Sequence, residues 1–177
     1  TPHALHLVTL LAYAVMIATV YWITGRLASR SAAIAASAFA AAQIVIPAFG
    51  SYPANTEVFL TTSITLSYAC VLLTRERDSV PSRQLLWTAL SGLAFGCAIS
   101  FKQVGVFHGL QIAVLVLLVP GAWKTRALRG AVFVIAAAAP LGLALAYWWS
   151  RGALQPFLDG VLLHNLGQVC AEHAGGV

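Results

Sequence analysis

Charged residues are scarce in this sequence. Only 8% of its 177 residues are charged, whereas 60% are hydrophobic and the mean hydropathy is +0.85. Soluble domains carry about 25% charged residues, so the composition excludes an ordinary soluble domain. Backbone groups in a bilayer must be satisfied within the segment that spans it. We therefore predict an all-α fold, a polytopic bundle of transmembrane helices.

Cysteine and intramembrane acidic groups are scarce as well. The three cysteines form no even set for a disulfide framework, and two of them, Cys70 and Cys97, lie inside apolar runs. No spacing typical of a metal site is present. No Asp, Glu or Arg is expected deep in an apolar run, which argues against a proton relay or an ion-coupled pathway, because these usually need such a group.

Six apolar runs are predicted to span the membrane, since a bilayer core needs about 20 apolar residues per helix. They cover residues 4–24, 31–49, 57–74, 85–101, 105–120 and 131–150. The fourth and fifth runs are short, so each helix would rise roughly 24–26 Å against a hydrocarbon core of about 30 Å. We expect the turn between them, Lys102 to Val104, to lie below the membrane surface and to form the floor of a cavity.

The basic residues indicate the orientation. If the spans alternate, eight of the ten Lys and Arg residues fall on one side, and Lys102 and Arg151 fall on the other. A basic excess marks the cytoplasmic side, so the N-terminus and Glu57 are expected outside. The sequence starts without Met or a basic signal-peptide region. We therefore expect a single transmembrane domain over residues 1–177 that is an internal fragment of a longer protein.

Two charged residues stand out against the apolar runs. Lys102 lies between two of them, where an ammonium costs roughly 3 kcal/mol or more at the bilayer centre, so we expect an anionic partner. The alternative is that Lys102 snorkels to the headgroups. Glu57 opens the third span, where the helix dipole favours its carboxylate; it is either a helix cap or an acid that faces an external cavity. Thr61, Thr65 and Tyr68 follow on one face and favour the cavity.

Three further residues are candidates for substrate binding. Tyr52 lies in the predicted outer loop before the third span. His164 and Asn165 follow the apolar run that comes after the sixth span. These two residues either line the same outer cavity or cap a short interfacial helix. No residue is assigned as a metal ligand.

A longer pattern runs through these features. The stretch GLAFGCAISFKQVGVFHGLQIAVLVLL places Gly92, Gly96 and Lys102 in the order Gly-x-x-x-Gly-x-x-x-x-x-Lys. Before it come a span, a short basic loop, an Ala-rich span, an outer turn and then Glu57. Over most of residues 4–165, this order resembles the polytopic GT-C glycosyltransferases, closest to their protein-mannosyltransferase and aminoarabinose-transferase group.

The resemblance implies an activity. We expect an integral-membrane glycosyltransferase that moves a hexosyl or pentosyl group from a polyprenyl-phosphate-linked donor at the extracytoplasmic face of the bacterial inner (plasma) membrane. It implies that Lys102 is the cation for the lipid phosphate, that Glu57 is a secondary acid near the active site, and that His164 and Asn165 match a substrate-binding position. The family's main catalytic Asp lies in a first outer loop that precedes this fragment, so the fragment alone is expected to be inactive.

The resemblance also bears on cofactors and partners. No cofactor is assigned, and a divalent metal is kept open. The expected partners are a lipid-linked sugar donor, membrane lipids and an acceptor that is a protein, a lipid or a glycan; no nucleic acid is expected. The alternatives are a transporter or flippase of lipid-linked sugars and a non-catalytic membrane assembly subunit. A transporter should show inverted repeats and polar breaks in mid-span. The one mid-span interruption that we find in the sequence is Pro140.

Overall fold

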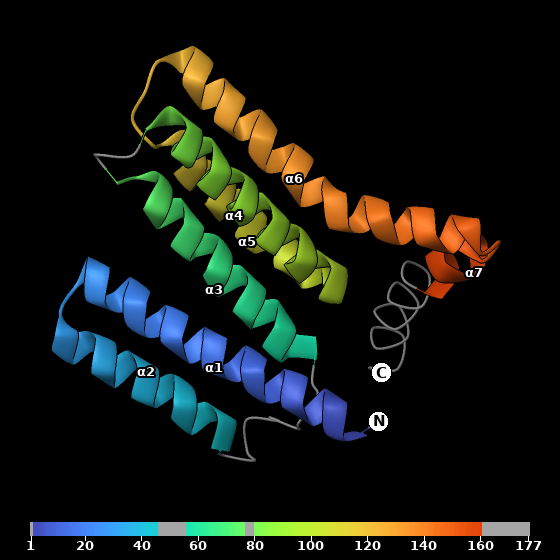
Figure 1. Cartoon of the computed structure of the whole chain (residues 1–177), viewed down its shortest axis with the longest axis horizontal. Helices are drawn as coiled ribbons and strands as arrows, with labels where there is room; N and C mark the ends of the chain where they lie inside the picture. The colour runs from blue at the N-terminus through green and yellow to red at the C-terminus, as the bar shows by residue number, and fades with distance from the viewer. Residues whose placement is uncertain (1, 46–55, 77–79, 161–177) are drawn as a thin grey trace, which may run out of the picture. The chain divides into compact units, whose positions relative to one another are not determined.

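The computed structural model describes residues 2–45, 56–76 and 80–160 of the chain. Across these ranges all regular structure is helical, which confirms the predicted all-α fold. Figure 1 shows the helices: α1 (Pro2–Leu27), α2 (Arg30–Val45), α3 (Thr56–Thr74), α4 (Pro81–Phe101), the 3₁₀ turn η2 (Gln103–Gly105), α5 (Val106–Leu117), α6 (Trp123–Ser150) and α7 (Leu154–Leu158).

Four of the helices, α1, α3, α4 and α6, are long and apolar enough to cross a bilayer. The expectation that the fourth span is short was wrong. Helix α4 begins at Pro81, four residues before the predicted span, and so has 21 residues. A helix of this length rises about 31 Å. The shortness that suggested a recessed turn therefore belongs to α5 alone, whose 12 residues rise about 18 Å. The end of the predicted second span, beyond Val45, lies outside the described residues.

The chain divides into two compact units, one ending at Pro140 and the other starting at Leu141. Pro140 lies within α6, where its ring removes one backbone hydrogen bond. The single domain predicted for residues 1–177 stays a prediction. In the second unit, Gly152 adopts φ +67° after α6, and the rings of Trp148 and Phe157 then stack with centroids 5.6 Å apart.

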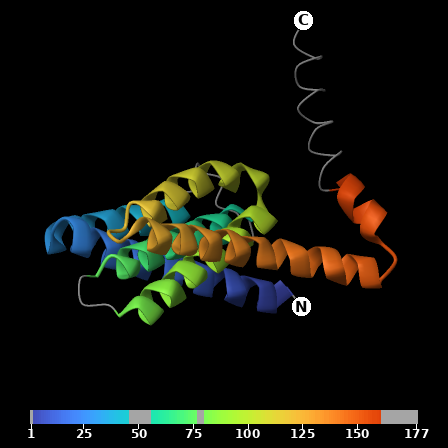
Figure 2. The same ribbon diagram turned by 90° about the horizontal axis from the view of Figure 1, so that it is seen from above.

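In the first unit, sequential helices run in opposite directions, and α1 lies between α2 and α3 (Figures 1 and 2). Helix α3 packs against α1 and α4, α2 packs against α1, and α5 contacts α3 and α4. The core joins four helices: it contains Val71, Phe95, Ile112, Val116 and Phe133. Many large apolar side chains on the outside of the helices are exposed. Such a surface is an aggregation hazard in water and suits contact with lipid, as expected for an integral membrane protein.

A hydrogen-bonded pair of serines links α3 to α4. Ser67 and Ser91 are fully buried. Their hydroxyl oxygens lie 2.9 Å apart, and each hydroxyl also reaches the backbone carbonyl of the other residue, at 2.9 and 3.0 Å. Hydrogen bonds of this kind hold transmembrane helices together because lipid offers no competing partners.

Three glycines lie at close contacts between helices. A Cβ built at Gly92 would overlap the carbonyl oxygen of Phe133, and one at Gly96 would overlap the carbonyl oxygen of Ala137. The backbone of α6 thus lies directly against these two positions of α4. On α5, a Cβ at Gly109 would overlap the ring of a core phenylalanine of α4. Small residues at helix contacts allow this approach.

Candidate functional site

The antiparallel helices of the first unit bring most basic residues to one end. The ends of α1 and α3 and the starts of α2, α4 and α6 meet there (Figure 1). The basic residues that these segments carry are Arg26, Arg30, Arg75, Arg83, Lys124, Arg126 and Arg129. An ion pair joins two of the helix ends, with Arg26 Nη1 2.7 Å from Glu76 Oε1. The predicted gathering of basic residues is therefore confirmed for the described residues; Arg77 lies outside them.

The opposite end carries the second ion pair, between Glu57 and Lys102. Lys102 Nζ donates to Glu57 Oε1 at 2.7 Å. Glu57 lies in the first turn of α3, and Lys102 caps the C-terminus of α4, 45 residues further along the chain. The side chains are 54% and 43% exposed, respectively. The pair is thus accessible at the end of the bundle and is not enclosed in the core.

Local backbone geometry sets the position of Lys102. Its extended conformation, φ −156° and ψ 126°, ends α4, while its N–H still donates to the Ala98 carbonyl at 3.1 Å. Its own carbonyl accepts from the N–H of Gly105 at 3.1 Å, which closes the turn. Gly105 is buried, and a Cβ there would lie 3.0 Å from Leu60 on α3. This contact keeps the turn against the start of α3, where Glu57 lies.

An aromatic contact adjoins the ion pair. The rings of Phe59 and Phe101 stack with centroids 5.3 Å apart. Phe59 follows Glu57 by two residues on α3, and Phe101 directly precedes Lys102 at the end of α4. Aromatic pairs contribute about 0.5–1.5 kcal/mol beyond the area they bury. The stack therefore holds the two charged helix ends together independently of the ion pair.

Of the five candidate site residues, the structure brings two together. Glu57 and Lys102 form the ion pair, whereas Tyr52, His164 and Asn165 lie outside the described residues, so their roles stay predictions. Lys102 was expected to have an anionic partner, and Glu57 is one. Sequence reasoning placed both residues at the same end of the bundle but did not pair them. The available signal was an acid that opens one span and a base that ends the next.

The hydroxyls of the polar face predicted for α3 are hydrogen-bonded within the bundle, and a cavity beside Glu57 stays a prediction. Thr61 donates to the Glu57 carbonyl at 2.7 Å, and Thr65 donates to the Thr61 carbonyl at 2.9 Å. These hydroxyls thus bond to their own helix. Tyr68 donates instead to Gln111 Oε1 of α5 at 2.7 Å.

Sequence reasoning missed one buried cation. Arg129 is 0% exposed, although it was expected to lie in a loop before the sixth span. Because α6 begins at Trp123, Arg129 falls within the helix. Its Nη2 donates to the Val119 carbonyl at 2.8 Å and the Pro120 carbonyl at 3.0 Å. Basic side chains can donate to the carbonyls at a helix C-terminus. These two hydrogen bonds therefore stabilise the turn between α5 and α6.

Metal ligands were considered separately. Within the described ranges, no three His, Cys, Asp or Glu side chains lie close enough together to hold an ion. A divalent metal as cofactor stays an open prediction.

Comparison with known proteins identifies the family. The family model described as dolichyl-phosphate-mannose-protein mannosyltransferase matches residues 2–149. Neither the curated proteins nor the solved structures gave a match. The matched range includes every described helix from α1 to almost the end of α6, and with it the Glu57–Lys102 pair. The chain therefore belongs to the dolichyl-phosphate-mannose-protein mannosyltransferase family of GT-C type membrane glycosyltransferases.

Proposed function

We propose that this chain forms part of an enzyme that transfers a sugar from a polyprenyl-phosphate-linked donor to an acceptor at the extracytoplasmic face of a bacterial inner membrane. The observation that carries the proposal is the accessible Glu57–Lys102 pair at the end of the bundle opposite the basic residues. A cation and a carboxylate 2.7 Å apart supply the two charges that this reaction needs. The family membership favours a glycosyltransferase over a transporter or an assembly subunit.

The ion pair is a resting arrangement in this proposal. A partly exposed pair is worth only about 0–1 kcal/mol, so a phosphodiester with its own negative charge competes for Lys102 at little cost. When the donor binds, the ammonium of Lys102 turns from the carboxylate to the phosphate. In this arrangement the carboxylate of Glu57 orients the acceptor.

The transfer step then uses both groups. The acceptor hydroxyl oxygen forms a bond to the anomeric carbon of the sugar, and the bond between that carbon and the phosphate oxygen breaks. The bonding electrons leave with the lipid phosphate, whose added charge Lys102 stabilises. The hydroxyl proton passes to a carboxylate base. By resemblance the main base is an Asp outside this chain, and Glu57 orients the acceptor as a secondary acid.

The Glu57→Gln variant tests the proposal. We expect it to lower sugar transfer by the complete gene product at least several-fold while the protein still folds, because a half-exposed ion pair contributes little to stability. The measurement is release of polyprenyl phosphate from a labelled lipid-linked sugar in membranes, with protein quantified in parallel.

The chain provides a matched control in its other ion pair. Glu76→Gln breaks the Arg26–Glu76 pair, which has the same 2.7 Å contact at the opposite end, and should leave transfer unchanged. Wild-type release by a well-expressed Glu57→Gln variant would remove Glu57 from the site. Movement of intact donor across the membrane without release of lipid phosphate would instead favour a flippase.

The side of the membrane has its own test. Single cysteines are placed at Thr56, exposed at the start of α3, and at Ser82, exposed at the start of α4, in a background without the native cysteines. We expect an impermeant thiol reagent to label position 56 and not position 82 in intact cells, since the basic end should face the cytoplasm. Equal labelling, or labelling of position 82 alone, would contradict this orientation.

A further inference from the structure

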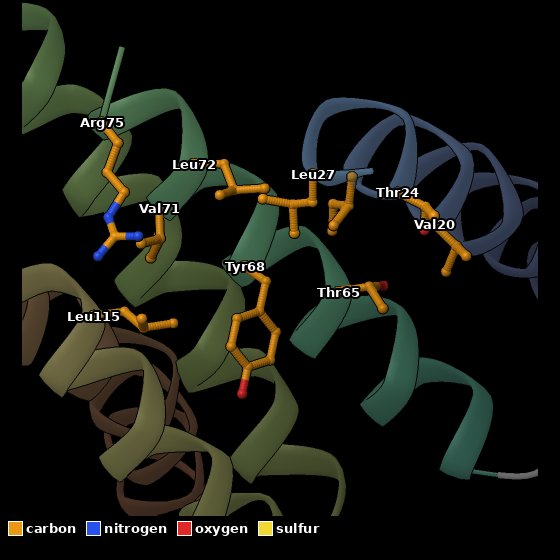
Figure 3. A pocket seen from close by; sticks show the side chains of 10 residues that line it. Val20, Thr24, Leu27, Thr65, Tyr68, Val71, Leu72, Arg75 and Leu115 are labelled. Carbon is orange, nitrogen blue, oxygen red and sulfur yellow. The ribbon is translucent and has the colours of Figure 1, made fainter. Parts of the chain in front are cut away.

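A groove of about 350 Å³ lies between α1 and α3, with one residue of α5 at its edge (Figure 3). Its walls are mainly apolar: Val20 and Leu27 come from α1, Val71 and Leu72 from α3, and Leu115 from α5. The groove does not include Glu57 or Lys102. It extends toward the basic end of the bundle, so it is distinct from the site proposed for sugar transfer.

Two polar side chains on α3 in the groove are already hydrogen-bonded. Thr65 donates to its own helix at 2.9 Å, and Tyr68 donates to Gln111 at 2.7 Å. Thr24 on α1 is the third hydroxyl of the lining. Apolar side chains make up most of the rest, and such walls suit a hydrocarbon chain.

The mouth of the groove carries a positive charge. Arg75 follows the last turn of α3, and its side chain extends along the same wall as Val71 (Figure 3). Arg75 is exposed and forms no ion pair within the described residues. The adjacent carboxylate of Glu76 is paired with Arg26 at 2.7 Å. An exposed guanidinium is suited to a phosphate.

The dimensions fit one leaflet. Ten residues separate Thr65 from Arg75 along α3, which is about 15 Å of helix. This length is half of a hydrocarbon core of about 30 Å. An acyl chain lying along this wall therefore extends toward the middle of the bilayer when its headgroup phosphate lies at the Arg75 end of the groove.

We propose that this groove binds one anionic glycerophospholipid from the leaflet at the basic end, with its phosphate on Arg75 and one acyl chain along the walls. Basic pockets between transmembrane helices select anionic headgroups in this way. The surrounding basic residues of this end add to the selection for a net negative lipid over a zwitterionic one. The inference does not depend on the proposed sugar transfer.

Native mass spectrometry of the complete gene product in detergent tests the inference. The protein is titrated with phosphatidylglycerol or phosphatidylcholine of identical acyl chains. We expect one phosphatidylglycerol to bind several-fold more tightly than phosphatidylcholine. Arg75→Gln should weaken phosphatidylglycerol binding about fivefold, since one basic residue near the surface contributes about 1 kcal/mol. Arg83→Gln, which removes an equal charge at the start of α4 outside the groove, should change it less than twofold.

A groove-filling variant separates the acyl chain from the headgroup. Leu72→Trp should weaken binding of both lipids without changing the charge, and Val20→Phe from the opposite wall replaces it if the first variant does not elute as a folded protein. The proposal would be overturned if the two Arg variants lost phosphatidylglycerol affinity equally, or if the wild-type protein bound the two lipids equally. Unchanged lipid binding in a folded groove-filling variant would also overturn it. Displacement of phosphatidylglycerol by equimolar undecaprenyl phosphate would also overturn it, because the occupant would then be the lipid carrier.

Discussion

Replacing Lys102 with Met is expected to lower kcat/KM for the lipid-linked sugar roughly tenfold to a hundredfold. The substitution keeps most of the apolar stem and removes the ammonium that contacts the donor phosphate in the proposed mechanism. Hydrogen bonds to charged groups are worth about 1.5–3 kcal/mol, and each 1.36 kcal/mol of transition-state stabilisation is about tenfold in rate. The measurement is the steady-state kinetics of the complete gene product in lipid nanodiscs.

Two companion variants make this result specific to the site. Lys102→Arg should recover part of the activity, because the charge remains while its geometry changes. Lys124→Met removes the other lysine of the chain, an exposed residue at the start of α6, and should leave kcat/KM unchanged. Unaltered kcat/KM in Lys102→Met would mean that Lys102 is an anchor for the headgroup region, as the snorkelling alternative holds.

Replacing Gly96 with Leu is expected to destabilise the fold strongly. A side chain there would meet the backbone carbonyl of Ala137 and, at 2.9 Å, the ring of Pro140. Neither of these can rotate away, so α4 and α6 must separate. Overpacking a tight contact costs about 1–3 kcal/mol and occasionally more. We expect a clear drop in melting temperature and in the yield of monodisperse protein after detergent extraction.

Gly142 provides the control for this variant. It lies in α6 like the residues that meet Gly96, but a Cβ built there has no heavy atom within 4 Å. Gly142→Leu should therefore leave stability unchanged or raise it slightly, since Gly is about 1 kcal/mol less favourable than Ala inside a helix. Equal melting temperatures of the Gly96→Leu and Gly142→Leu variants would show that the close approach of α4 and α6 is not required.

Length and composition were sufficient to predict the helices but not their exact limits. The predicted fourth span began at residue 85, whereas α4 begins at Pro81; the polar residues of its first turn concealed the start. The same cause placed Arg129 in a loop, although α6 begins at Trp123 and buries it. Polar residues at a helix start carry no apolar signal, and the first turn is recognised from its caps and contacts.

The Glu57–Lys102 pair shows where prediction of the site stopped. The sequence placed an acid at the start of one span and a base at the end of the next, and short loops with antiparallel helices bring such ends to the same side. Whether the two side chains touch depends on how each helix is rotated and on the turn that packs Gly105 against Leu60. The predicted partner of Lys102 was a lipid phosphate. In the structure, its ammonium contacts the carboxylate of Glu57.

By itself, the sequence determined that this is a membrane protein of antiparallel helices with a basic end and an opposite end that carries Glu57 and Lys102. Apolar run length and the placement of charge are sufficient for this, because the bilayer imposes both. Only the tertiary structure decided the ion pair, the burial of Arg129 and the groove that ends at Arg75. Helices that are apolar on every side show no preferred face in their sequence, so close packing between distant segments sets their rotation and lateral contacts.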